Sequence, residues 1–191
     1  MLSLLAAYME DPRQARMIAR IEPHPLAAFL FSSVLVLGSA LAAAIAAREP
    51  SLDAALLTVA LGLLIFGLSW IPFTLCLHGI CRLLGRRGDH RSLQTQVALA
   101  LWPLMILPPA GLIQFLSGWE SQILFSGPVI GTMVLTGLSL RQAVISNYGL
   151  TKSHANIALA GSALIVAGFL GFLLAGLTSA VLFVTVASAV L

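Results

Sequence analysis

Long runs of apolar residues, separated by short polar segments, make up most of the chain. Five runs contain no Asp, Glu, Lys or Arg, and they cover 23–47, 54–81, 92–119, 121–140 and 153–191. A helix needs roughly 20 apolar residues to cross the hydrocarbon core of a bilayer, which is about 30 Å thick. Each run is long enough, whereas a transmembrane β-barrel would show short segments of alternating polarity. The pattern predicts an all-α fold, a polytopic transmembrane helical bundle of five spans.

We expect two parts, a cytoplasmic interfacial segment over 1–24 and a transmembrane domain over 25–191. Asp11 followed by Pro12 favours a helix start, because a capping side chain precedes a proline suited to the first turn. Arg13, Arg16 and Arg20 would fall along one side of this helix. The helix then lies on the membrane surface with its arginines toward lipid phosphates, or it is a solvated helix without a lipid role.

The expected spans are, in order, 25–47, 54–82, 92–117, 122–142 and 155–190. Small residues in the stretch GSALAAAIAA would let the first span pack closely against another helix. The last span would be unusually long, since 36 residues at 1.5 Å each extend about 54 Å. It could fold back as two short spans, but no proline or charge interrupts it. We therefore prefer one span.

Basic residues fall almost entirely on one side of this topology. Of the ten Lys and Arg residues, nine lie in the amino-terminal segment and in the second and fourth loops, and only Arg48 lies opposite. Short cytoplasmic loops carry such an excess of positive charge. The amino terminus is therefore expected in the cytoplasm and, after five spans, the carboxyl terminus on the opposite side. The abundance of Arg, Ala, Leu and Gly indicates a GC-rich bacterial genome and hence the bacterial cytoplasmic (inner) membrane.

The second loop, HGICRLLGRRGDHR at 78–91, is the most polar stretch of the chain, and we call it the hook. A structural zinc site takes four ligands, usually with paired spacing, and no CxxC, HxxxH or HExxH pattern is present. No metal or other cofactor is therefore expected. Anionic lipid headgroups suit the arginines better, and nucleic acid does not, because no aromatic residues interleave them. We predict a lipid or partner site made by His78, Arg82, Arg86, Arg87 and Arg91.

Several prolines and glycines within the spans point to irregular or closely packed helices. Pro108 and Pro109 are expected to break the third span near the middle of the membrane. Such a break either lines a cavity or is a packing kink that neighbouring helices cover. We favour the packing kink. Gly127 and Gly131 form a small-xxx-small pattern for packing within the bundle or between chains. The residues assigned to a kink or cavity are Pro72, Pro103, Pro108, Pro109 and Gln114.

Two loops of the chain resemble a known family. LHGICRLLGRRGDHRS precedes a proline-containing third span, and LRQAVISNYGLTKSHANIALAG forms the fourth loop. Together they resemble the Yip domain family of five-pass membrane proteins over 25–190. Arg82 and Gly85 ahead of span three, and Lys152 and Ala155 at the start of span five, carry the resemblance.

That resemblance implies an amino terminus in the cytoplasm and a carboxyl terminus at the far face. Eukaryotic members are implied to bind Rab GTPases and other Yip-type subunits in vesicle trafficking. Because residues 1–24 are much shorter than the long polar amino-terminal region of those members, the chain resembles the short bacterial branch. The resemblance supplies no biochemical role for that branch.

The residues favour a function without catalysis. Full charges are absent from the middle of every span, which argues against ion-coupled transport. No serine–histidine or paired-carboxylate set is expected at membrane depth. We therefore predict a non-enzymatic scaffold that acts through anionic lipids and as a homo- or hetero-oligomer with other membrane proteins. The alternatives are a small permease or channel that uses the broken third span and, less favoured, a membrane enzyme acting on lipid-like substrates.

Overall fold

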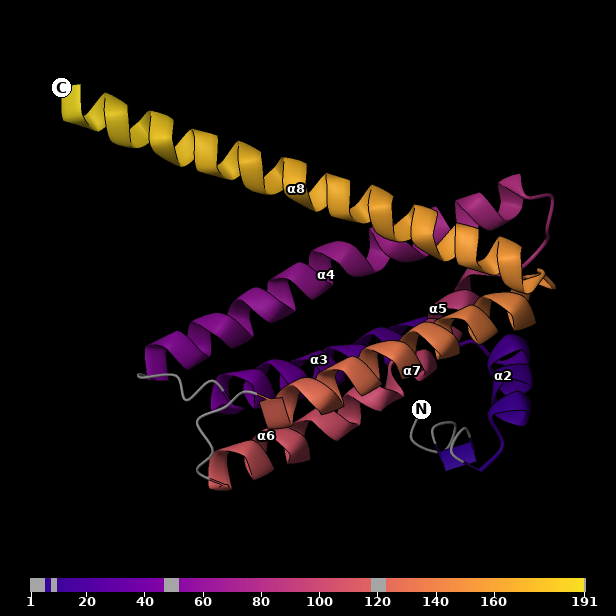
Figure 1. Cartoon of the computed structure of the whole chain (residues 1–191). Helices are drawn as coiled ribbons and strands as arrows, with labels where there is room; N and C mark the ends of the chain where they lie inside the picture. The colour runs from indigo at the N-terminus through magenta and orange to yellow at the C-terminus, as the bar shows by residue number, and fades with distance from the viewer. Residues whose placement is uncertain (1–5, 8–9, 47–51, 118–122, 191) are drawn as a thin grey trace.

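A computed structural model describes residues 6–7, 10–46, 52–117 and 123–190 (Figure 1). Every regular element in these ranges is a helix, and five helical stretches are long and apolar enough to cross a membrane. The prediction of an all-α, multi-pass membrane protein is thereby confirmed. The elements are α2 (Pro12–Ile21), α3 (Pro25–Ala46), α4 (Leu52–Leu83), α5 (His90–Ala100), η1 (Trp102–Ile106), α6 (Leu107–Leu116), α7 (Ile123–Tyr148) and α8 (Lys152–Val190).

The long helices lie roughly side by side, and α2 runs across one end of them (Figure 1). The same end carries the hook and the turn between α7 and α8, and we call it the hook end. α3 packs against α4, α5 and α6, while α8 packs mainly against α4. The carboxyl-terminal part of α8 extends away from the other helices as one continuous rod (Figure 1).

The third span consists of three consecutive helical pieces, α5, η1 and α6. The 3-10 turn η1 interrupts the α-helix at Trp102–Ile106, with Pro103 near its start. Pro108 and Pro109 lie in the first turn of α6. The expected break is therefore present, and it lies directly before Pro108 and Pro109, where η1 gives way to α6. A proline in the first turn of a helix costs little, because its missing N–H group would have no partner within the helix. Pro72 lies inside α4, which continues through it.

The small residues of α3 meet α6 at close range. A Cβ atom placed on Gly111 would lie 2.7 Å from the Ala42 carbonyl oxygen. One turn earlier on each helix, a Cβ atom on Gly38 would lie 3.3 Å from Cγ of Pro108. This contact confirms that the first span packs closely through its small residues. Pro108 touches this interface through its Cγ atom, and the residue is otherwise exposed.

Gly127 and Gly131 do not pack within the bundle. Both are exposed on α7, and no other described residue lies within 4 Å of a Cβ atom built on either one. Their predicted role in packing within the bundle was wrong, because α7 turns a different face inward. That face carries Thr132, Ala143, Val144 and Asn147, all buried. A role for the two glycines between chains stays a prediction.

α7 and α8 are longer than the expected spans. α7 continues to Tyr148 rather than ending near 142, and Gly149, with a φ of +63°, follows its last residue. Glycine suits this left-handed conformation, which commonly ends a helix. α8 begins at Lys152 and runs unbroken to Val190, so the last run is one helix and not two. Its 39 residues extend about 58 Å, well beyond the hydrocarbon core.

Candidate functional site

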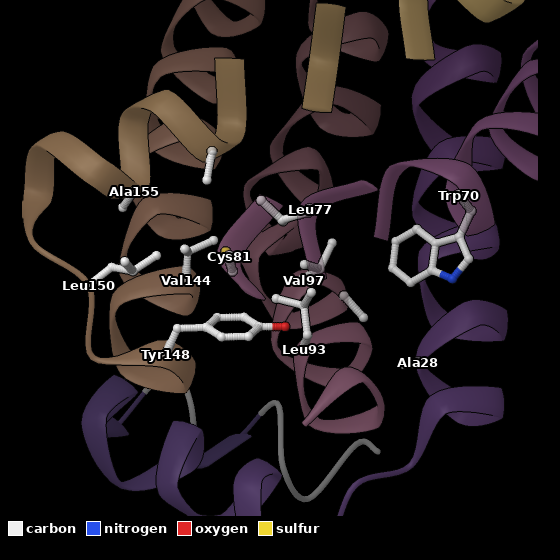
Figure 2. Packing of buried hydrophobic residues seen from close by; sticks show 12 residues of the cluster. Ala28, Trp70, Leu77, Cys81, Leu93, Val97, Val144, Tyr148, Leu150 and Ala155 are labelled. Atoms are coloured by element: carbon white, nitrogen blue, oxygen red, sulfur yellow. The ribbon is translucent and has the colours of Figure 1, made fainter. Parts of the chain in front are cut away.

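A network of hydrogen bonds joins α4, α5 and α7 at the hook end. Nδ1 of His78 and the hydroxyl oxygen of Tyr148 are 2.6 Å apart. The ring of His90 lies beside that of His78, with 5.4 Å between centroids. Tyr148 is almost completely buried, and its ring reaches from the end of α7 toward Leu93 of α5 (Figure 2). The two ends of the hook are thereby held together, because His78 bonds to Tyr148 and His90 lies against His78.

The hook passes so close to Tyr148 that only glycine fits at one position. A Cβ atom on Gly88 would overlap the Tyr148 ring. The next residue, Asp89, caps α5, because its side chain accepts a hydrogen bond of 2.7 Å from the backbone N–H of Ser92. The Asp89 carbonyl oxygen accepts a second bond, of 3.0 Å, from Nδ2 of Asn147. The end of the hook is therefore fixed to both α5 and α7.

Polar side chains also pair between α5 and α7 inside the bundle. Gln96, which is 1% exposed, accepts a hydrogen bond of 2.6 Å from the Ser146 hydroxyl at Oε1. Its Nε2 donates to Oγ of Ser92 at 3.0 Å. Unpaired polar groups are costly where lipid or protein replaces water. These pairs explain how a span with this many polar residues is accommodated.

Four arginines surround this network on the outside. α4 ends at Leu83, Gly85 in the turn after it has a φ of +75°, and the Arg86 N–H donates to the Cys81 carbonyl at 3.3 Å. This pattern ends the helix and starts the exposed part of the hook. Arg82, Arg86, Arg87 and Arg91 are all exposed. His78 differs from them, because it is half-buried and its side chain meets Tyr148.

The residues of the predicted kink and cavity do not form one site. Pro72 lies in α4, whereas Pro108 contacts Gly38 of α3. Gln114 is buried in α6 and only 3% exposed. Pro108 contacts Gly38, but Pro108 and Pro109 are both exposed, so the described helices do not cover the proline segment.

An apolar cavity of about 300 Å³ lies between α4, α5, α7 and α8. Trp70, whose ring contacts those of Phe29 and Phe66, forms part of its wall. Its apolar lining suits an alkyl or acyl chain. A membrane enzyme acting on such a chain would need a group such as His78 in the wall, and His78 is not among the described lining residues. These are Phe66, Ser69, Trp70, Phe73, Val97, Leu101, Leu140, Ala163, Val166, Ala167 and Leu170.

A second cavity, of about 370 Å³, lies at the hook end between α2 and α7. Its chemistry is different, because two arginines of α2 form one side of it. Arg16, Met17 and Arg20 come from α2, and Gln142, Ile145 and Ser146 come from α7. Arg16 and Arg20 were noted in the sequence as facing lipid, but nothing in the sequence pointed to their α7 neighbours.

Sequence reasoning missed the polar residues that hold the hook end together. Ser146, Asn147 and Tyr148 were taken as loop, because the stretch after Arg141 is polar. Two signals were present, the Asn-Tyr-Gly sequence at 147–149 that fits a helix end and the Asp-x-x-Ser spacing of a capped helix start at 89–92. The pairing of each residue with a partner 50 or more positions away has no local signal.

The comparisons with known proteins add no relative to this picture. No family model, no curated protein and no solved structure matches the chain.

Proposed function

We propose that the chain is a non-enzymatic scaffold of the inner membrane that gathers anionic lipid, and through it membrane partners, at its hook end. The single observation that carries the proposal is the exposure of Arg82, Arg86, Arg87 and Arg91 around a hook that hydrogen bonds hold in place. Membership of the Yip domain family belongs to the same proposal and rests on the hook and the fourth loop alone.

Exposed arginines at the end of a membrane bundle suit phosphate-bearing headgroups. The planar guanidinium group donates two parallel hydrogen bonds to phosphate oxygens. Each basic residue near an anionic membrane surface contributes about 1 kcal/mol, or about fivefold in affinity. The hook is held at the residues that follow Arg86 and Arg87, because Gly88 and Asp89 lie against α7.

The packing of the third span favours a scaffold over a permease. A permease would use Pro108 and its neighbours to line a route, and here Pro108 touches Gly38, is otherwise exposed, and lines neither of the two cavities described above. Flux of small solutes into liposomes that contain the pure protein would support the permease instead.

The test is retention of lipid by the purified protein. The wild type and the variant Arg86→Gln, Arg87→Gln, Arg91→Gln are reconstituted with equal amounts of phosphatidylglycerol and phosphatidylcholine, re-extracted in mild detergent and analysed by native mass spectrometry. We expect the wild type to retain several phosphatidylglycerol molecules preferentially and the triple variant to retain fewer of them. Arg48→Gln, at the one basic position predicted for the opposite side, is the matched control. Equal retention by wild type and triple variant would contradict the proposal.

A further inference from the structure

We propose that the cavity between α2 and α7 is a binding site for a phosphate group, with Arg16 and Arg20 as its ligands. This inference deepens the proposed lipid-binding function and rests on it, but it concerns a different set of residues from the hook. The same phosphate chemistry is offered by an anionic lipid headgroup and by a small soluble organophosphate, and the experiment below separates the two.

α2 is held in a fixed rotation about its own axis. Ala15 and Ala19 are completely buried, and they form a small core with Leu99 of α5, against which Phe31 and Trp102 pack. The helix also has a capped start, since the Asp11 side chain accepts a hydrogen bond of 3.3 Å from the Gln14 N–H. Docking by the alanine face decides where the other faces of α2 point.

The arginine face of α2 borders the cavity. Arg16 and Arg20 are four residues apart and therefore lie one above the other on the same side of the helix. Both line the cavity, and so does Met17. Two guanidinium groups one turn apart present several N–H donors to one space, an arrangement that matches the oxygens of a phosphate.

α7 supplies the opposite wall. Gln142 is exposed and offers an amide donor, while Ile145 offers an apolar surface for the glycerol or the start of an acyl chain. Ser146 also lines the cavity, but its hydroxyl donates to Gln96 at 2.6 Å and so belongs to the contact between α5 and α7. None of the described residues that line the cavity carries a carboxylate, and two of them are arginines.

The cavity lies near the end of α7, which the predicted topology places at the headgroup layer. Gln142 and Ser146 lie six and two residues before the end of α7 at Tyr148, about 9 Å and 3 Å along the helix. The polar layer on each side of a bilayer is about 5–8 Å thick. The volume of about 370 Å³ lies within the range of small-ligand sites, roughly 300–1,000 Å³. A phosphate with its glycerol therefore matches the cavity in charge, depth and size.

The experiment compares two double variants that remove the same charge from different places. Arg16→Gln, Arg20→Gln alters the cavity, and Arg86→Gln, Arg87→Gln alters the hook. Each protein is placed in phosphatidylcholine nanodiscs and titrated with phosphatidylglycerol, with native mass spectrometry as readout. In a parallel arm, glycerol 3-phosphate is added to the protein in neutral detergent and its melting temperature is measured.

We expect the cavity variant to lose its tightest phosphatidylglycerol, with an affinity at least tenfold weaker, whereas the hook variant keeps that lipid and loses the weaker ones. If glycerol 3-phosphate stabilises the wild type but not the cavity variant, and no tightly bound lipid is seen, the site is supported. Its ligand is then a soluble organophosphate and not a lipid headgroup. If the cavity variant binds lipid and glycerol 3-phosphate like the wild type, the inference is overturned. If the wild type shows no preference for phosphatidylglycerol, the proposed function fails instead.

A folding defect in the cavity variant is excluded with Arg16→Lys, Arg20→Lys. This variant keeps both charges but loses the planar fork that binds two oxygens at once. We expect its melting temperature to equal that of the wild type and its affinity for phosphatidylglycerol to lie between those of the wild type and the glutamine variant. Wild-type affinity in the lysine variant together with a misfolded glutamine variant would contradict the arginine-specific site.

Discussion

The side chains of His78 and Tyr148, 70 positions apart in the chain, meet through a hydrogen bond of 2.6 Å. His78 belongs to α4 and Tyr148 to the last turn of α7, so the bond joins the helix before the hook to the helix before α8. Gly88 lies against the ring of the same tyrosine. Tyr148 is therefore the residue on which the order of the hook end depends.

Tyr148→Phe tests the hydrogen bond separately from the ring. The variant keeps the buried ring and removes the hydroxyl group that meets His78. We expect the free energy of unfolding to fall by about 1 kcal/mol, the net value of one hydrogen bond. Denaturation in mixed micelles measures it, and an unchanged value would show that the bond adds nothing to stability.

Gly88→Ala tests the contact between the hook and the ring. The new methyl group would overlap Tyr148, and relieving the overlap is expected to cost about 1–3 kcal/mol. In a Tyr148→Ala background the same change should cost little, so a double-mutant cycle should give a coupling energy above about 0.5 kcal/mol. Additive effects of the two changes would argue against the contact. Gly79→Ala is the control, since no other described residue lies within 4 Å of a Cβ atom there.

Asp89→Ala should destabilise the start of α5. The substitution removes the carboxylate that accepts from the Ser92 N–H, and losing such a cap costs about 1 kcal/mol. Asp89→Asn keeps an oxygen acceptor and should retain most of the stability. Hydrogen exchange at the first turn of α5 is the local readout, and equal exchange in the two variants would contradict the capping role.

Gly111→Ala should separate α3 from α6. Its methyl group would lie 2.7 Å from the Ala42 carbonyl oxygen, which cannot move without moving the backbone of α3. We expect a loss of about 1–3 kcal/mol in stability. Gly131→Ala, in open space on α7, should be neutral or slightly stabilising, because alanine favours a helix more than glycine does. Equal stabilities of the two variants would refute the close packing.

Reporter fusions after Leu191 test the predicted orientation. Five spans with nine basic residues on one side predict a carboxyl terminus outside the cytoplasm. An alkaline phosphatase fusion should therefore be active and a green fluorescent protein fusion dark. The opposite result would reverse the topology and place the hook on the far side.

The spans were predictable because a helix that crosses the hydrocarbon core needs a long stretch of apolar residues, and the charge-free runs are plain in the sequence. The end of α7 was not, because Ser146 and Asn147 look like loop residues until Gln96 and the Asp89 carbonyl are seen as their partners. The arginines of the hook were found from charge alone. The cavity beside Arg16 and Arg20 could not be predicted, because its other wall comes from α7, which is distant in the sequence.

The burial of α5 has a consequence for how the protein is made. Eight of its eleven residues are buried, among them Ser92, Thr95 and Gln96, so little of this helix faces lipid in the folded protein. Such a segment gains little from entering a bilayer alone. We therefore expect α5 to reach its final depth in the membrane only after the neighbouring helices have packed around it.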